Sequence, residues 1–539
     1  MGSARILRAV CRILQRTFFV RAVRTVSQNA KRRAQNARAT LFDIKPQPSN
    51  IKDPMRILMI SAEAPPLHRV GALVDVLDAL PRELRERGHE VSVVLPFYRE
   101  IRENSLVEIN DTGVTVDIRV GEKNYVAEYF EGRTPSGVQL FFVRCDEFFD
   151  RPEIYGEHGA TYEDNATRFI FFNKAAIELA RRLTPAPQIL HLHDWAAALI
   201  PVYIHAHNLP FATVLTIHRL AEQGSFWGLD FALTNLPQRF FSLRGVEFFG
   251  RLNFLKAGIV FADRITTVSE HHKQEILQPE GGYELDVVLR ENAHKLSGIL
   301  HGADYARWDP ATDPLLPAHF ESEKLWGKMI CRDALLADLG LAPGPRGPGF
   351  GMVTRVVAEK GFGILTPLFD RLLTDDVRLI ILGEGDPAFE TALAIAARRY
   401  PLRFAYRRHF DEKLAHLIQA GSDITLIPSR FEPSGLIAMY SLRYGAIPVA
   451  HASGGIQEIV QDYDPTLEPS ESGYGFLYYD YSSEAFWDSI KRARALFRDR
   501  AVWTGLIRRA MEREFSWSAA AERYEELYRS LVRETEIAA

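Results

Sequence analysis

The chain has 539 residues, of which 47% are hydrophobic and 25% are charged, and its formal net charge is -4. This length exceeds what one hydrophobic core supports and predicts two or three domains, and the charge gives no electrostatic reason to expect nucleic-acid binding. The three cysteines, Cys11, Cys145 and Cys331, lie too far apart in sequence to predict a disulfide framework or a cysteine metal site, and no apolar stretch has the length of a membrane span.

Residues 1–54 differ in composition from the rest. Residues 1–42 hold nine Arg and one Lys but no Asp or Glu, and apolar residues recur among them at helical spacing. This is typical of an organelle transit peptide, which would take the protein to a plastid or mitochondrion. Two alternatives stay open: Met55 is the functional start of a cytoplasmic protein, or the segment is a retained basic arm.

From Arg56 onward, strand-like and helix-like segments alternate, which predicts an α/β fold with parallel sheets and helices on both faces. A helix is expected over 72–87, ended by Gly88. The apolar runs of the first half are 57–61, 91–95, 139–143, 188–191 and 213–216.

A Pro- and Gly-rich stretch, 341–349, separates these elements from a second series. Strands are expected over 350–353, 378–382, 403–405, 424–428 and 447–450, and a helix over 437–444. The restart predicts a second doubly wound domain. The last segment, from Phe515 to Val532, has the pattern of an amphipathic helix.

His193 follows the first of two neighbouring apolar runs, and His218 follows the second. Ligands bind outside the carboxyl ends of strands in open α/β sheets, so the imidazole of His193 is a candidate for a site. Asp194 is expected to orient backbone rather than to titrate. In the block 253–263, which has the pattern of a helix that packs on the sheet, only Lys256 has a claim to a site.

Two cations, Arg355 and Lys360, follow the strand over 350–353, and Gly361 gives the chain room to turn. Side chains five positions apart after a strand can converge on one anion. Downstream, Glu432 is presented at the end of the strand over 424–428, just before a helix start, where a carboxylate suits the hydroxyls of a sugar and helix-start amides favour phosphate.

These motifs resemble those of the bacterial glycogen synthases and plant starch synthases, and the resemblance runs from Met55 to about Val532. It rests on Glu432-Pro-Ser-Gly-Leu, His193-Asp-Trp, Thr-Ile-His218 and the segment from Arg355 to Gly361. The related class of nucleotide-sugar transferases carries a second Glu eight positions after the first. This chain has Tyr440 there, as glycogen synthases do.

The resemblance implies a GT-B fold: two doubly wound Rossmann-like domains that face a cleft, with a C-terminal helix crossing back. The expected boundaries are 1–54 for the extension, 55–305 for an acceptor-side domain, 306–345 for a linker, 346–510 for a nucleotide-sugar-binding domain and 511–539 for the crossing helix.

The implied activity is retaining transfer of glucose from ADP-glucose to an α-1,4-glucan, with ADP-glucose as donor substrate and no cofactor or metal. In the family, the His of His-Asp-Trp lies at the donor glucose, the Arg and Lys clamp the diphosphate, and the Glu lies near the nucleotide sugar. His193, Arg355, Lys360 and Glu432 are therefore the expected catalytic residues. The expected substrate-binding residues are Arg69, Gly71, Ala72, Asp75, His218, His301, Ser434, Gly435, Ser453, Gly454 and Gly455.

The chain departs from the family pattern at several of these positions. The first loop, usually Lys-Thr-Gly-Gly-Leu, reads Arg69-Val-Gly-Ala72-Leu, and Asn-Gly-Ile-Asp becomes His301-Gly-Ala-Asp. If the position of Ala72 needs a positive φ, Ala costs about 1 kcal/mol or more there. A catalytically weak or inactive paralogue that binds glucan or regulates is therefore the alternative function, and use of UDP-glucose is a third possibility. The sequence leaves the oligomeric state undecided.

Overall fold

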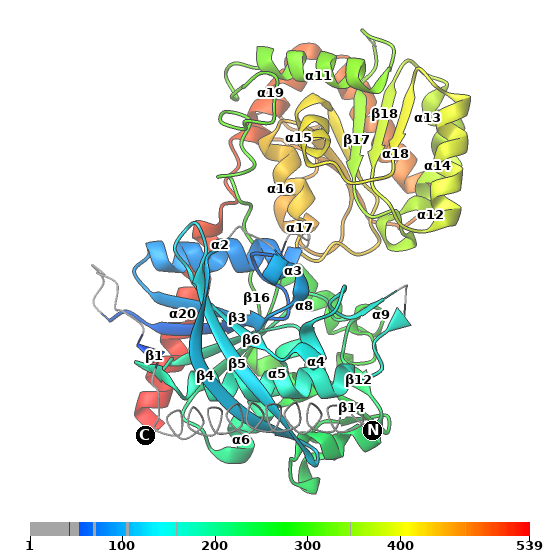
Figure 1. Ribbon diagram of the computed structural model, residues 1–539. Helices are drawn as coiled ribbons and strands as arrows, with labels where there is room; N and C mark the ends of the chain where they lie inside the picture. Colours follow the sequence, from blue (N-terminus) through cyan, green and yellow to red (C-terminus); the bar gives the residue numbers. More distant parts are fainter. Residues whose placement is uncertain are drawn as a thin grey trace, which may run out of the picture.

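The computed structural model describes residues 42–43, 53–67, 72–103, 107–157, 160–344, 346–468 and 470–538. These residues form two α/β domains, one above the other, and the last helix runs along the lower one (Figure 1). The expectations for residues 1–41, Arg69 and Gly71 lie outside the described residues.

The first domain is built on a nine-stranded sheet with the order β16-β15-β11-β10-β2-β3-β6-β5-β4. The strands from β16 to β6 pair in parallel, and the hairpin of β4 and β5 adds two antiparallel strands at one edge. The bounds are β2 Arg56–Ile60, β3 Glu90–Pro96, β4 Ile109–Val120, β5 Lys123–Arg133, β6 Gln139–Arg144, β10 Ile189–His193, β11 Ala212–Ile217, β15 Arg264–Thr267 and β16 Leu296–Gly298.

Helices cover this sheet, and the predicted one is α2, Ala72–Glu86. Gly88 has a φ of 93° and its amide donates to the carbonyl of Arg85 (2.8 Å), so it ends α2 as a left-handed residue should. The other main helices are α5 Asn165–Ala180, α6 Ile200–His207, α7 Phe254–Phe261, α8 Glu270–Ile276 and α9 Pro279–Gly282.

The second domain holds a six-stranded parallel sheet with the order β19-β18-β17-β20-β21-β22. Its strands are β17 Gly349–Val353, β18 Arg378–Leu382, β19 Phe404–Arg407, β20 Ile424–Ile427, β21 Ile447–His451 and β22 Phe476–Tyr478. Its helices include α11 Trp326–Leu339, α14 Pro387–Arg399, α15 Glu412–Gly421, α16 Leu436–Arg443, α17 Ile456–Ile459, α18 Ser483–Phe497 and α19 Arg500–Met511.

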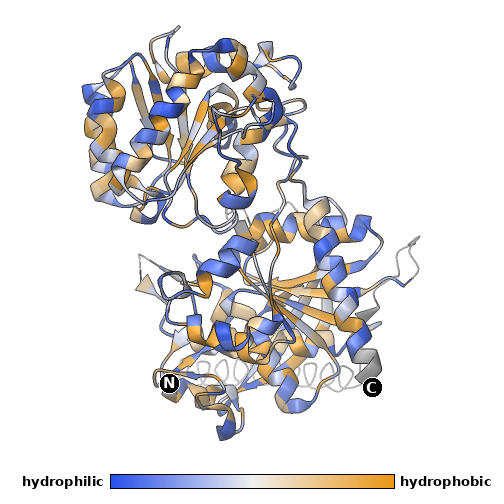
Figure 2. Ribbon diagram, turned by 180° about the vertical axis from the view of Figure 1, so that it is seen from behind, coloured by the Kyte–Doolittle hydropathy of each residue, from blue (hydrophilic) through white to orange (hydrophobic). Residues whose placement is uncertain are grey.

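Each domain has its own hydrophobic core, seen as apolar strands between amphipathic helices (Figure 2). The second core begins at Ala303 and includes Leu316, Phe320 and Cys331. The segment 306–345, expected to be a linker, therefore packs into the second domain and contains α11. The Pro- and Gly-rich composition extends only over its last residues.

The last helix, α20, spans Trp517–Ala538. Six of its residues belong to the core of the first domain, although they follow the whole second domain in sequence: Trp517, Ala520, Ala521, Tyr524, Tyr528 and Leu531. The crossing helix predicted for the C-terminus is thus a structural part of the first domain.

Candidate active site

An ion pair forms the centre of the site in the second domain. Nζ of Lys360 lies 2.7 Å from Oε2 of Glu432, and the two side chains are 15% and 12% exposed. Lys360 follows β17 and Glu432 follows β20, and these strands are neighbours in the sheet. The structure therefore brings together two predicted catalytic residues that lie 72 positions apart.

Gly361 explains how Lys360 reaches Glu432. Its φ is +86°, and a Cβ there would lie 2.0 Å from the carbonyl oxygen of Pro428 at the end of β20. Only glycine allows this approach, because other residues add that Cβ and disfavour a positive φ. The amide of Arg430 also donates to the carbonyl of Glu359 (2.8 Å), which ties the two loops together.

The segment Ser453-Gly454-Gly455 supports the backbone of the Glu432 loop. A Cβ on Gly454, whose φ is +46°, would lie 2.4 Å from the carbonyl oxygen of Glu432. The amide of Gly455 donates to the carbonyls of Glu432 (3.1 Å) and Pro433 (2.9 Å). These close contacts with the Glu432 loop explain structurally why both positions are glycine. The hydroxyl of Ser453 is buried and has no hydrogen-bond partner among the described residues.

The other predicted residues of this domain lie on the same strand ends. Gly435 has a φ of +69° and precedes α16, where a Cβ would lie 2.6 Å from Cδ1 of Ile459. Ser434 is half-buried, and Arg355 is exposed just after β17. Within the part of the chain that the structure describes, the guanidinium of Arg355 forms no ion pair, so its charge faces solvent.

In the first domain, a cluster of buried imidazoles occupies the strand ends. His191 and His193 lie two positions apart in β10, so both side chains point to one face of the sheet. Their ring centroids are 4.2 Å apart. Nδ1 of His193 is hydrogen-bonded to Nε2 of His218 (3.0 Å), and the ring of His218 lies 5.2 Å from that of His301. We call His191, His193, His218 and His301 the histidine cluster.

Burial keeps the histidine cluster neutral. It lowers the pKa of His191 and of His301 from 6.5 to about 3, and it holds the pKa of His193 and His218 well below that ordinary value. Neighbouring imidazoles lower the pKa of His191, His193 and His218 further. Nε2 of His193, Nδ1 of His218 and Nε2 of His301 are buried without a hydrogen-bond partner among the described residues. Neutral imidazoles with free nitrogens are suited to bind hydroxyl groups.

Asp194 orients backbone, as expected, but its pKa does not support the expectation that it fails to titrate. Its carboxylate accepts hydrogen bonds from the amides of His218 (2.7 Å) and Arg219 (3.2 Å), and its own φ is 56°. Burial raises the pKa of Asp194 to about 7. This carboxyl group holds the turn that carries His218. Nothing in the sequence pattern predicts its left-handed backbone.

Asp75 lies at the junction of the two domains. Its charged neighbours are Asp78, Asp304 and Arg307, and burial is the main cause that raises its pKa to about 6. Tyr440 lies close to it across the junction, stacked on Trp308 with ring centroids 4.5 Å apart. The predicted substrate residue Asp75 is thus near the two domains' connection, whereas the side chain of Ala72 lies outside the described residues.

Lys256 and Arg219 make contacts within their own domain. The buried ammonium of Lys256 donates to the carbonyls of Leu243 (2.8 Å) and Glu247, so it supports the preceding loop. Arg219 pairs with Glu63 (3.3 Å) and Glu222 (3.2 Å).

Sequence reasoning missed the residues that join the two halves of the site. The hydroxyl of Ser269, the N-cap of α8, donates to the carbonyl of Pro433 (2.8 Å), next to Glu432. Glu275 accepts from the amide of Gly454 (2.7 Å), and Glu458 accepts from the amide of His271 (2.9 Å). These two carboxylates form a reciprocal contact between α8 and α17. A Ser before an acidic first turn signals an N-cap, but not its partner in the other domain.

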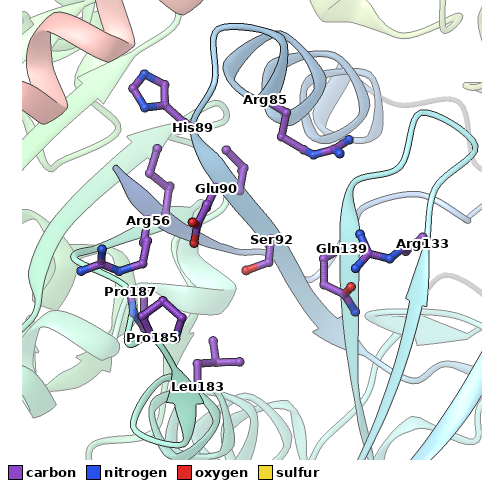
Figure 3. A pocket seen from close by; sticks show the side chains of 12 residues that line it. Arg56, Arg85, His89, Glu90, Ser92, Arg133, Gln139, Leu183, Pro185 and Pro187 are labelled. Carbon is purple, nitrogen blue, oxygen red and sulfur yellow. The ribbon is translucent and has the colours of Figure 1, made fainter. Parts of the chain in front are cut away.

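A separate pocket lies at the opposite ends of the strands (Figure 3). Arg56, Glu90 and Gln139, the first residues of β2, β3 and β6, line it, and none of the predicted site residues does. Ligands of α/β sheets bind at the carboxyl ends instead. Among the described residues, no cluster of His, Cys, Asp and Glu could hold a metal ion, and none of the described helices is long and apolar enough to cross a membrane.

Each of the two domains matches the model of a known protein family. Residues 56–291 match the family model of the starch synthase catalytic domain, and residues 345–501 match that of the glycosyl transferases group 1. A glycogen synthase of Anaeromyxobacter dehalogenans (strain 2CP-1 / ATCC BAA-258) is 44% identical over 484 residues, which cover 88% of this chain and 99% of that protein. A glycogen synthase of Koribacter versatilis (strain Ellin345) is 39% identical over 481 residues, 88% of this chain and 98% of that protein.

Solved structures of related enzymes have a similar fold. The catalytic domain of starch synthase IV from Arabidopsis thaliana, bound to ADP and acarbose, has a TM-score of 0.81 and 30% identity and covers 89% of this chain and 100% of its own. A sucrose-phosphate synthase from Thermosynechococcus elongatus, 18% identical with a TM-score of 0.56, shares the fold. The two α/β domains and these neighbours confirm the predicted GT-B fold.

Proposed function

The chain is a glycosyltransferase of the glycogen and starch synthase family, and on that premise we propose that it transfers glucose from ADP-glucose to the end of an α-1,4-glucan with retention of configuration. The observation that carries the proposal is the Lys360–Glu432 ion pair at neighbouring strand ends. It lies in a chain that aligns with glycogen synthases over almost their whole length.

Lys360 and Arg355 bind the diphosphate of the donor. Negative charge builds on this group as the glycosidic bond to glucose breaks, and fixed cations stabilise that charge most effectively where little water competes. Lys360 is already held in place by Glu432, whereas exposed Arg355 is free to close on the phosphates.

Glu432 and His193 hold the glucose. A carboxylate bonded to an ammonium is a poor nucleophile, so Glu432 positions hydroxyl groups and balances charge rather than forming a covalent bond. The free Nε2 of His193 bonds a second hydroxyl from the side of the first domain. Orientation of the donor against the acceptor hydroxyl supplies much of the rate enhancement.

The altered loops are compatible with this activity. Ala72 begins helix α2, where helical φ and ψ suit alanine, so the expected cost of a positive φ does not arise. His301 joins the histidine cluster and packs 5.2 Å from Trp517. The surroundings of His301 therefore accommodate its imidazole ring.

The test is to incubate the full chain with ADP-glucose and maltooligosaccharide, with UDP-glucose in parallel, and to measure ADP or UDP release and chain extension. Extension from ADP-glucose supports the proposal. Transfer from UDP-glucose alone would overturn the choice of donor. Glucan binding without transfer from either donor would favour a non-catalytic paralogue.

A further inference from the structure

Helix α20 contacts the histidine cluster at two places. The hydroxyl of Tyr528 lies 2.7 Å from Nδ1 of His191, a residue 337 positions earlier. Eleven residues before it, Trp517 packs on His301 with ring centroids 5.2 Å apart. Tyr528 and His191 are both 0% exposed. The last helix runs along the side of the first domain (Figure 1), and its buried face reaches the histidine cluster.

Both ring nitrogens of His191 are hydrogen-bonded, and the bonds select one tautomer. Nε2 lies 2.6 Å from the hydroxyl of Thr216, which lies 2.6 Å from the hydroxyl of Thr266. The phenol of Tyr528 has no other hydrogen-bond partner among the described residues, so its hydrogen must be donated to Nδ1 of His191. His191 then carries its proton on Nε2 and donates it to Thr216.

The tautomer and tilt of His191 matter because its ring packs directly on that of His193. The two centroids are 4.2 Å apart, with 39° between the ring planes. Besides this ring contact, the side chain of His193 has one hydrogen bond, to His218. Its free Nε2 is the atom that we assign to the glucose. A rotation of His191 would remove the surface against which His193 rests.

We propose that Tyr528 is a positioning residue for glucosyl transfer: by donating its hydroxyl hydrogen to Nδ1 of His191, it fixes the ring that supports His193. The burial of the phenol keeps it protonated, since it holds the pKa of Tyr528 well above its ordinary value. This inference rests on the function proposed above. Docking of the C-terminal helix becomes a condition for the geometry of the donor site.

The decisive variant is Tyr528→Phe in the full-length protein, which removes one oxygen and keeps the ring. We expect kcat with ADP-glucose and maltooligosaccharide to fall about 10- to 100-fold, as for other groups that orient functional histidines, while KM for ADP-glucose changes less than about threefold. Rates are expressed per folded molecule, with the folded fraction measured by circular dichroism.

Tyr524→Phe is the matched control. Tyr524 lies one turn away on α20, is also 0% exposed, and contacts the ring of His191 at 5.4 Å. Its hydroxyl makes no hydrogen bond to that ring and lies instead beside the hydroxyls of Thr216 and Thr266, so this control removes a neighbouring buried hydroxyl and keeps the bond to Nδ1 of His191. Its loss should leave kcat within about twofold of wild type, because the ring of residue 524 and the bond from Tyr528 to Nδ1 of His191 both remain. A purely structural role of the buried hydroxyls would lower the stability of both variants and kcat of neither.

Two further measurements separate positioning from stability. His191→Gln keeps a donor toward Thr216 but places no acceptor at the position of Nδ1, so the double variant with Tyr528→Phe should be no slower than the slower of the two single variants. With ¹⁵N-histidine labelling, Tyr528→Phe should change the signals of the His191 ring nitrogens, assigned by their loss in His191→Gln.

Unchanged ring signals, an additive double variant, or a kcat of Tyr528→Phe equal to that of Tyr524→Phe would each overturn the proposal. Failure of the proposed function is recognised separately, because wild-type protein would then transfer glucose from neither nucleotide sugar. In that case the nitrogen signals still decide whether Tyr528 sets the tautomer of His191.

Discussion

The two halves of the site use different chemistry. In the first domain, the histidine cluster is buried, neutral and held by ring contacts and hydrogen bonds within the fold. In the second domain, Lys360 and Glu432 form a partly exposed ion pair on loops, and Arg355 faces solvent. Both sets lie at the carboxyl ends of parallel strands, so the fold alone does not account for the difference.

The difference matches what each half is proposed to bind. Hydroxyl groups of a neutral sugar are bound by neutral donors and acceptors, which need to be rigid to be selective. A diphosphate needs positive charge, and charged side chains keep their ionisation more easily when water reaches them. The contacts of Ser269 with Pro433, and of Glu275 with Gly454, join the rigid half to the charged one.

The largest effect is expected at Glu432. Glu432→Ala removes the charge that the second domain contributes beside Lys360, and turnover should fall at least ~100-fold, as for the loss of one preorganised electrostatic contact. Glu432→Gln keeps the shape and separates charge from position. Initial rates of ADP release measure both, and Glu471→Ala, an exposed carboxylate of the same domain, serves as control. A near-normal rate for Glu432→Ala would refute its role.

Lys360→Ala should have the next largest effect. Loss of a charged hydrogen bond to the diphosphate is worth about 1.5–3 kcal/mol, so kcat/KM for ADP-glucose should fall about 10- to 100-fold while the fold is retained. Lys413→Ala, an exposed lysine on α15, should leave the kinetics unchanged. Unaltered donor kinetics in Lys360→Ala would argue against the clamp.

The neutral half is tested by pH. His301 has a folded pKa of about 3 against 6.5 unfolded, so below pH 6.5 the unfolded state binds the extra proton and stability falls as pH decreases toward 3. The buried carboxyls Asp75 and Asp194, with pKa values raised to about 6 and about 7, act in the opposite direction.

Wild type and His301→Asn both contain Asp75 and Asp194, so the contribution of these carboxyls cancels when the two proteins are compared. The slope of the free energy of unfolding between pH 6.5 and 4.5 should therefore be shallower in the variant by up to ~1.4 kcal/mol per pH unit, the value for one proton. Urea unfolding at several pH values measures it. Equal slopes in the two proteins would show that His301 titrates normally.

The smallest effect is expected at Ala72. Because this residue begins α2, Ala72→Gly should change stability by no more than about 0.5 kcal/mol and kcat by less than about threefold. Thermal unfolding and the ADP-release assay measure the two. A large gain in activity would instead show that the methyl group obstructs the substrate.

Much of the fold was readable from the sequence because its strands are buried runs between turn residues. All ten predicted strands lie on or overlap observed ones, from β2 to β21. The hairpin of β4 and β5 was missed: many of its side chains point to solvent, so no apolar run marks it. Helix α11 was hidden in the expected linker because it exposes Trp326 and Met329, which blurs its periodicity.

The sequence predicted those site residues that directly follow a strand within a short motif. His193, His218, Lys360 and Glu432 were predicted from the family motifs that contain them together with the strands that precede them, and the structure has all four at strand ends. Contacts between distant segments, such as Tyr528 with His191, leave no local pattern. The roles of Gly454 and Gly455 also depend on a partner, since their amides contact Glu275, Glu432 and Pro433 rather than solvent.

The crossing of α20 has a consequence for how the protein is made. Trp517, Tyr524, Tyr528 and Leu531 complete a core whose other members precede residue 300. During synthesis the first domain emerges from the ribosome first, and domains generally fold in that order. Here the first domain stays unfinished until the last helix has been translated, so the second domain is free to fold earlier. A premature stop before residue 517 would damage the beginning of the protein more than its end.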